Sequence, residues 1–130
     1  MVARRVGEID WTTWQAADLA TLTFIVCGDR MLGTHRQHIY GLAAKHRLLG
    51  MYANRRFVDS GGLMSYGSNL TDVYRGLAIY LDKILKGSRP GDLPMQQPTK
   101  FEIALNLRAA KAIGFSIPDA MRLRADYVID

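Results

Sequence analysis

The polar residues best suited to binding chemistry stand where short apolar runs end. Ser65, Tyr66 and Gly67 separate one such run from a long predicted helix, and the free N–H groups at a helix N-terminus favour an anion such as a carboxylate. Asp29 follows another run and could pair with an ammonium group. Tyr52 and Tyr66 could form an aromatic wall. Together these residues suit a zwitterionic amino acid, although a helix cap, a turn aspartate and two core tyrosines would explain them equally.

No catalytic or metal-binding constellation stands out. His35 and His38 would share a helix face, but no third ligand follows at helical spacing, so surface histidines are the better interpretation. The glycine-rich stretch at 61–67 fits neither a dinucleotide motif nor a P-loop, and there is no GxSxG elbow. Cys27, the single cysteine, ends an apolar run and is predicted to be a buried structural thiol. We therefore expect a protein that is not an enzyme and uses no metal and no cofactor.

Length and charge narrow the class further. The 130 residues fit a single domain over residues 1–130. The net charge of +5 raises nucleic acid or anionic membrane as partners, but the basic residues are dispersed, so we expect no nucleic-acid partner. No apolar stretch reaches the ~20 residues of a bilayer span, which argues against membrane insertion. The first residues show no signal-peptide pattern, so a cytoplasmic location is expected if the chain is the full gene product.

Apolar spacing predicts strands that alternate with helices. This order favours an α/β fold, a three-layer sandwich whose mostly parallel sheet is covered on both faces. Ligands of such sheets bind beyond the carboxyl ends of the strands, which selects the loops at 28–33, 54–56 and 67–71. The predicted strands are 22–27, 48–53, 63–66 and 101–105; the predicted helices are 8–20, 34–47, 55–59, 70–85 and 107–113, with a helical turn from 118, an extended connection at 88–98 and a tail at 127–130.

The segment GGLMSYGSNLTDVYR at 61–75 resembles the core signature of ABC transporter substrate-binding proteins associated with tryptophan and tyrosine uptake. Residues 80–118 continue the resemblance, as do IYGLAAKHRLLGMY at 39–52 and the final MRLRADYVID. It covers residues 36–130 well and residues 7–35 loosely. The loop after the first strand keeps Asp29 but lacks the prolines that the family tends to have there, and the residues after Tyr52 lack the usual acid or aromatic.

The resemblance implies a Rossmann-like single lobe of a type-I periplasmic-binding-protein fold, in which two lobes hold a solute between them. Family members are usually more than twice this length and exported, and this chain is similar to the second lobe and the C-terminal crossing segment. The family pattern is retained at 65–67 and at Thr71 and Asp72, which adds those two residues to the expected ligand contacts. The implied partners are an amino-acid-like ligand and, if the chain is functional in transport, an ABC permease.

A lobe without its companion would leave apolar surface exposed, and such patches mark interfaces. We therefore expect a homodimer, with the segment at 87–105 as a candidate for exchange between subunits. Two alternatives to a solute receptor stay open at this point. One is a truncated lobe with only a structural, dimerising role, and the other is a cytoplasmic sensor that reuses the lobe without a role in transport.

Overall fold

The computed structural model describes residues 23–130. Five strands form one sheet in the order β1-β2-β3-β4-β5, and each strand therefore lies beside its neighbour in sequence. All pairs are parallel except β3 with β4, which are antiparallel, so the prediction of a mostly parallel sheet is confirmed. The strands are β1 (Thr23–Val26), β2 (Leu49–Tyr52), β3 (Met64–Ser68), β4 (Phe101–Asn106) and β5 (Tyr127–Ile129).

Helices connect the strands, and side-chain caps mark where several of them begin. Asp29, Asn54, Asn69 and Asn106 each accept a hydrogen bond from a backbone N–H in the first turn that follows, as N-cap residues do. The predicted helix at 8–20 lies outside the described residues. The helices are α1 (Arg30–Thr34), α2 (Arg36–Lys45), α3 (Arg55–Asp59), α4 (Leu70–Leu85), the 3-10 turn η3 (Pro90–Asp92), α5 (Leu107–Ala112) and α6 (Asp119–Arg124).

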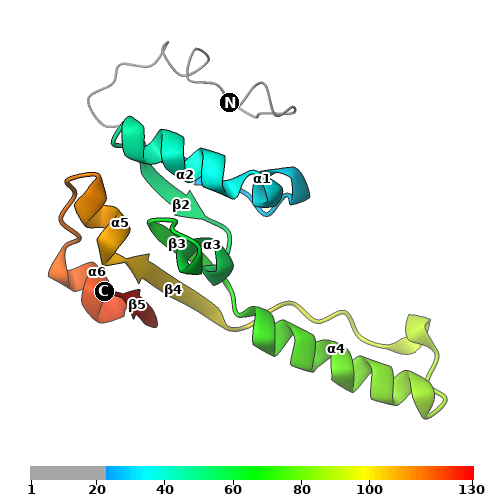
Figure 1. Ribbon diagram of the computed structural model, residues 1–130. Coiled ribbons are helices and arrows are strands. Elements are labelled where there is room, and N and C mark those ends of the chain that lie inside the picture. Colours follow the sequence, from blue (N-terminus) through cyan, green and yellow to red (C-terminus); the bar gives the residue numbers. More distant parts are fainter. Residues whose placement is uncertain (1–22) are drawn as a thin grey trace.

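The core lies on both faces of the sheet, because alternate side chains of each strand point to opposite sides. On one face, Val26 and Tyr52 pack with side chains of α2 and α3. On the other face, Leu105 packs with Ile113 and the neighbouring side chains of α5 and α6. The helices therefore form two layers around the sheet (Figure 1), and the predicted three-layer α/β architecture is confirmed.

Two local predictions were wrong. Residues 127–129 form β5 rather than a tail, pairing in parallel with β4 from Ala104 opposite Tyr127. Asp126 fixes this strand, because its carboxylate accepts from Ile103 N at 2.8 Å and its own N–H donates to Ile103 O at 2.9 Å. Cys27 is exposed rather than buried, because β1 ends at Val26 and the next residue already belongs to the turn.

Helix α4 and its return segment form an arm that projects from the sheet (Figure 1). The helix has 16 residues and none of them is buried. Gly87 follows it with a φ of 101°, the left-handed conformation in which helices commonly end. The chain then runs back beside the helix to β4 (Figure 1). Among residues 23–130, no helix combines the length and the apolar composition of a bilayer span.

Candidate ligand-binding site

A polar hollow opens at the carboxyl ends of β1 and β2, which is where parallel sheets bind their ligands. Asp29 lies in its wall and caps α1, accepting from Met31 N at 2.8 Å and Leu32 N at 3.2 Å. Both bonds use Oδ1, so Oδ2 can accept from a ligand. The hollow has a volume of about 700 Å³ and is lined by Gly28, Asp29, Arg30, Gly33, Thr34, Arg36, Asn54, Arg56, Phe57, Asp59 and Ser60.

Helix α3 extends this site toward β3. Asn54 begins the helix by accepting from Arg56 N at 3.1 Å. Arg55 contacts Asp59 at 3.5 Å, and its guanidinium lies 3.5 Å from the ring centroid of Tyr127. Arg56 and Asp59 also line a second hollow, which reaches the start of α4 at Asn69, Leu70, Thr71 and Tyr74 and includes Glu102. Because the two hollows share Arg56 and Asp59, they form one contiguous polar edge at the carboxyl ends of β1, β2 and β3.

The first hollow carries an excess of positive charge. Three arginines line it, Arg30, Arg36 and Arg56, against two acids, Asp29 and Asp59. Arg36 is tied to the preceding turn, since its Nη1 donates to Gly33 O at 2.9 Å. Arginine presents a planar fork of donors that matches a carboxylate. The arrangement therefore suits a ligand with one anionic group and, opposite Asp29, one cationic group.

Two of the predicted ligand residues do not reach this edge. Ser65 and Tyr52 are 0% and 1% exposed, respectively. They lie in register on neighbouring strands, and the alternation of side chains turns both inward. The Tyr52 ring stacks on Phe57 at 5.4 Å and meets Tyr40 edge-on at 5.3 Å, and burial raises the pKa of Tyr52. The structure therefore corrects their predicted placement from a ligand wall to the core.

The remaining predicted residues lie in different parts of the fold. Tyr66 points to the opposite face of the sheet, where its half-exposed ring stacks on Phe101 at 5.8 Å. Gly67 lies against the backbone carbonyl of Ala53, so the glycine is needed for close approach of the chain. Thr71 lines the second hollow. Only Asp29 and Thr71 of the predicted set therefore lie on the contiguous edge.

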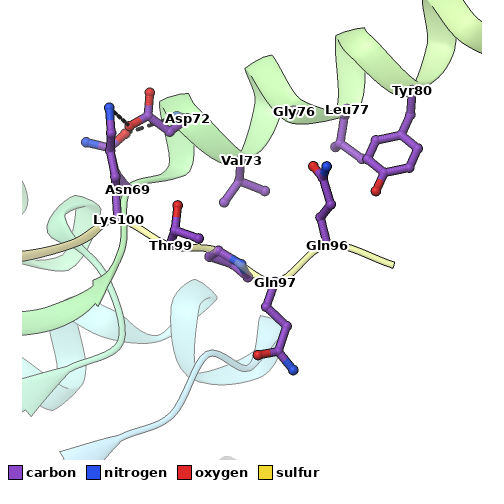
Figure 2. Close-up of a pocket in the computed structure, with 11 residues that line it drawn as sticks. Asn69, Asp72, Val73, Gly76, Leu77, Tyr80, Gln96, Gln97, Thr99 and Lys100 are labelled. Atoms are coloured by element: carbon purple, nitrogen blue, oxygen red, sulfur yellow. Dashed lines mark hydrogen bonds and ion pairs between the residues drawn. The ribbon is translucent and has the colours of Figure 1, made fainter. Parts of the chain in front are cut away.

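Asp72 serves the arm instead. It contacts Arg75 at 3.0 Å and Lys100 at 3.2 Å, and these cations, Lys100 first, lower the pKa of its carboxyl. Figure 2 shows it at one end of a groove between α4 and residues 96–100, with Val73, Leu77 and Tyr80 along the helix. The Tyr80 hydroxyl donates to Pro94 O. These contacts hold the return segment beside the helix.

Asn54, Arg56 and Asp59 were not predicted as site residues, although the loop at 54–56 was expected at this edge. The signal for Asn54 and Arg56 was their position shortly after a strand of a parallel sheet, whereas Asp59 ends α3 and has no such signal. The charges of Arg56 and Asp59 alone resemble ordinary surface. Among residues 23–130, no group of three His, Cys, Asp or Glu side chains is arranged to hold a metal ion.

The fold and the position of the site define a lobe of the periplasmic-binding-protein kind. The family model of the ABC transporter substrate binding protein matches residues 2–129, and the chain belongs to this family. A comparison with curated proteins gave no match.

Three solved structures are similar to the chain. A conserved domain protein from Vibrio cholerae O1 biovar El Tor is 24% identical with a TM-score of 0.77, over 82% of this chain and 36% of that one. The ABC domain in complex with L-Trp from Streptococcus pneumoniae is 19% identical with a TM-score of 0.79, over 91% and 39%. The ligand-free, open CD0873 from Clostridium difficile, a substrate binding protein with adhesive properties, is 21% identical with a TM-score of 0.59, over 82% and 36%. The chain thus spans well under half the length of these structures.

Proposed function

We propose that this chain is a solute-receptor lobe that binds an amino acid or a similar small carboxylate and makes or breaks no bond. The contiguous polar edge along β1, β2 and β3 carries this proposal. In it, Asp29 Oδ2 accepts from the ligand ammonium, and Arg56 holds the carboxylate. Thr71 contacts the far end of the ligand. Arg56 replaces Ser65 as the carboxylate partner, because the serine is buried.

Membership of the substrate-binding family and the L-Trp in the Streptococcus pneumoniae structure support an amino acid as the ligand class. The same membership supports a role for this lobe in an exported receptor that delivers its ligand to an ABC permease. Because one lobe leaves the ligand open on one side, whereas most binding sites enclose it, we expect affinity in the millimolar range, roughly that of the weakest specific complexes.

The proposal is tested by thermal shift with L-amino acids at millimolar concentration. A ligand at about ten times a millimolar Kd, on the order of 10 mM, stabilises a fold by about 1.4 kcal/mol, which is several degrees for a domain of this size. L-Trp is compared with tryptamine, which lacks the carboxylate, and with indole-3-propionate, which lacks the amine. We expect both analogues to shift the Tm less than L-Trp. A flat response across all amino acids would contradict the proposal.

Asp29→Asn separates binding from folding. Asparagine caps a helix about as well as aspartate, so the unliganded Tm should stay close to that of the original chain. The loss of charge should remove the response to L-Trp and leave the weak response to indole-3-propionate unchanged. Asp119→Asn, at the start of the distant helix α6, is the matched control and should keep the full response. Equal L-Trp responses in the two variants would rule out Asp29 as the ammonium partner.

A further inference from the structure

Helix α3 carries two polar residues of the candidate site, Arg56 and Asp59, on a helix of only five residues. The last four carbonyl groups of a helix have no partner within it, and an isolated helix shorter than about 12 residues is marginal in water. In α3 these four carbonyls belong to residues 56–59. The position of Arg56 therefore depends on what the rest of the fold donates to them.

Two buried side chains from other elements donate to the carbonyls of α3. The Tyr40 hydroxyl, on α2, donates to Phe57 O at 2.7 Å. Asn106, at the end of β4, donates through its Nδ2 to Val58 O at 3.3 Å. Tyr40 is 9% exposed and Asn106 6%, so water does not readily replace either donor once it is removed. Figure 1 shows α3 between α2 and β4, and the two bonds hold it from both sides.

The amide of Asn106 serves two helices at once. Its Oδ1 accepts from Ala109 N at 3.0 Å and caps α5, while its Nδ2 donates to α3. Neither Asn106 nor Tyr40 is among the described residues that line the two hollows of the candidate site. A ligand in these hollows does not touch them, so an effect of either residue on binding must pass through α3.

The opposite side of the candidate site has a separate support. Asp29 takes its position from α1, where it accepts from Met31 N and Leu32 N. Neither of these bonds involves an atom of α3. The proposed ammonium partner, Asp29, and the proposed carboxylate partner, Arg56, therefore depend on different contacts. Loosening α3 should change the carboxylate contact alone.

We propose that Tyr40 and Asn106 are positioning residues, which fix Arg56 against the ligand carboxylate by donating to the carbonyls of α3. This inference rests on the proposed function, in which Arg56 holds the carboxylate. The groups of a binding site must be held within about 0.5 Å of their productive geometry. Removal of either donor therefore weakens the carboxylate contact although Arg56 itself is still present.

NMR titration of the 130-residue chain with L-Trp, indole-3-propionate and tryptamine tests the proposal. Asn106→Ser keeps the cap of α5, because serine is a good N-cap, but it lacks the amide that reaches Val58 O. Tyr40→Phe keeps the ring and removes only the hydroxyl. We expect each variant to weaken L-Trp and indole-3-propionate by roughly three- to tenfold, the size of one hydrogen bond. Tryptamine, which has no carboxylate, should bind as it does to the original chain.

Amide hydrogen exchange of the unliganded variants tests the support of α3 without a ligand. The amides of Gly61 and Gly62 donate to the same two carbonyls, Val58 O and Phe57 O. They should exchange faster in both variants than in the original chain. Unchanged exchange at these two glycines would overturn the claim that the side-chain donors hold α3.

Ile113→Val is the matched control, since Ile113 is 9% exposed and packs with Leu105 on the other face of the sheet. It should lower the Tm and leave all three affinities unchanged. Undiminished L-Trp binding in Asn106→Ser or Tyr40→Phe would overturn the role of that residue. An equal loss for tryptamine would reduce both residues to a general structural role, with the proposed function still in place. A chain that binds none of the three ligands would overturn the proposed function and this inference together.

Discussion

Gly67 is the residue of the predicted site at which the surrounding backbone leaves no space for a side chain. An added methyl group would overlap the Ala53 carbonyl oxygen, which is backbone and cannot rotate away. We expect Gly67→Ala to lower the free energy of unfolding by about 1–3 kcal/mol, the usual cost of overpacking, as measured by urea denaturation.

Gly41→Ala is the control for this prediction. Gly41 lies within α2, and nothing stands within 4 Å of the position that its Cβ would take. The change should raise stability by roughly 0.5–1 kcal/mol, because alanine favours the helix. If Gly67→Ala were as harmless as Gly41→Ala, the close approach of β3 to Ala53 would not be a constraint on the fold.

The individual roles in the candidate site were harder to predict than its position. Sequence order placed Asp29 and residues 65–67 at strand ends; Asp29 lies just beyond β1, whereas residues 65–67 lie within β3, which runs to Ser68. The direction in which each side chain points depends on the pleat of the sheet, and one shift in phase moves a residue to the other face. For this reason Ser65 was expected in the ligand wall and lies under α3, while Arg56 was missed and lies at the edge.

At the scale of elements, length and periodicity decided which predictions were confirmed. Helix α4 was predicted at 70–85 and forms at Leu70–Leu85. Its apolar residues recur continuously at helical spacing, Asn69 caps its start and Gly87 follows its end. Strand β5 was missed because three residues are too few to show a period. Its pairing depends on Asp126 bonding to Ile103, 23 positions away in sequence, and local patterns carry no information about such contacts.

The arm depends on Asp72, which joins α4 to its return segment. Lys100 and Arg75 lower the pKa of this carboxyl. Its ion pairs therefore stabilise the arm at pH values above the ordinary carboxyl pKa, and they are lost as the pH falls through the lowered pKa. We expect amide hydrogen exchange at residues 96–100 to accelerate below about pH 3.8, the unperturbed carboxyl value.

Asp72→Asn should abolish this acid-dependent step and show fast exchange at neutral pH. Asp119→Asn, which removes an exposed ion pair with Arg122 on α6, should leave the step unchanged. An acid response that survives in Asp72→Asn would show that another group holds the return segment in place.

At the scale of the whole molecule, the chain combines a layered α/β lobe with an arm that carries apolar surface but no buried residue. The lobe was predictable because strands alternating with helices allow few arrangements. The antiparallel pairing of β3 with β4 was not, since it follows from the excursion of the arm between them (Figure 1).

The stability of the lobe should fall at alkaline pH because its core contains two tyrosines. Burial raises the pKa of both Tyr40 and Tyr52 above the ordinary value of 10.0. Above pH 10 the unfolded chain loses these protons while the folded chain keeps them. Ionisation therefore lowers the free energy of the unfolded state relative to the folded state. The free energy of unfolding should therefore be level below pH 9 and decline above pH 10, by at most about 1.4 kcal/mol per pH unit for each tyrosine.

Urea denaturation between pH 8 and 11 measures this decline, and Tyr52→Phe assigns it. The Tyr52 ring packs between Phe57 and Tyr40, and phenylalanine keeps that packing without a group that ionises. The variant should show a shallower alkaline slope than the original chain. Tyr40→Phe should also flatten the slope but start from lower stability at pH 8, because the Tyr40 hydroxyl donates to Phe57 O at 2.7 Å. Parallel slopes in all three proteins would place the alkaline transition outside this core, and the burial of Tyr52 would then have no part in it.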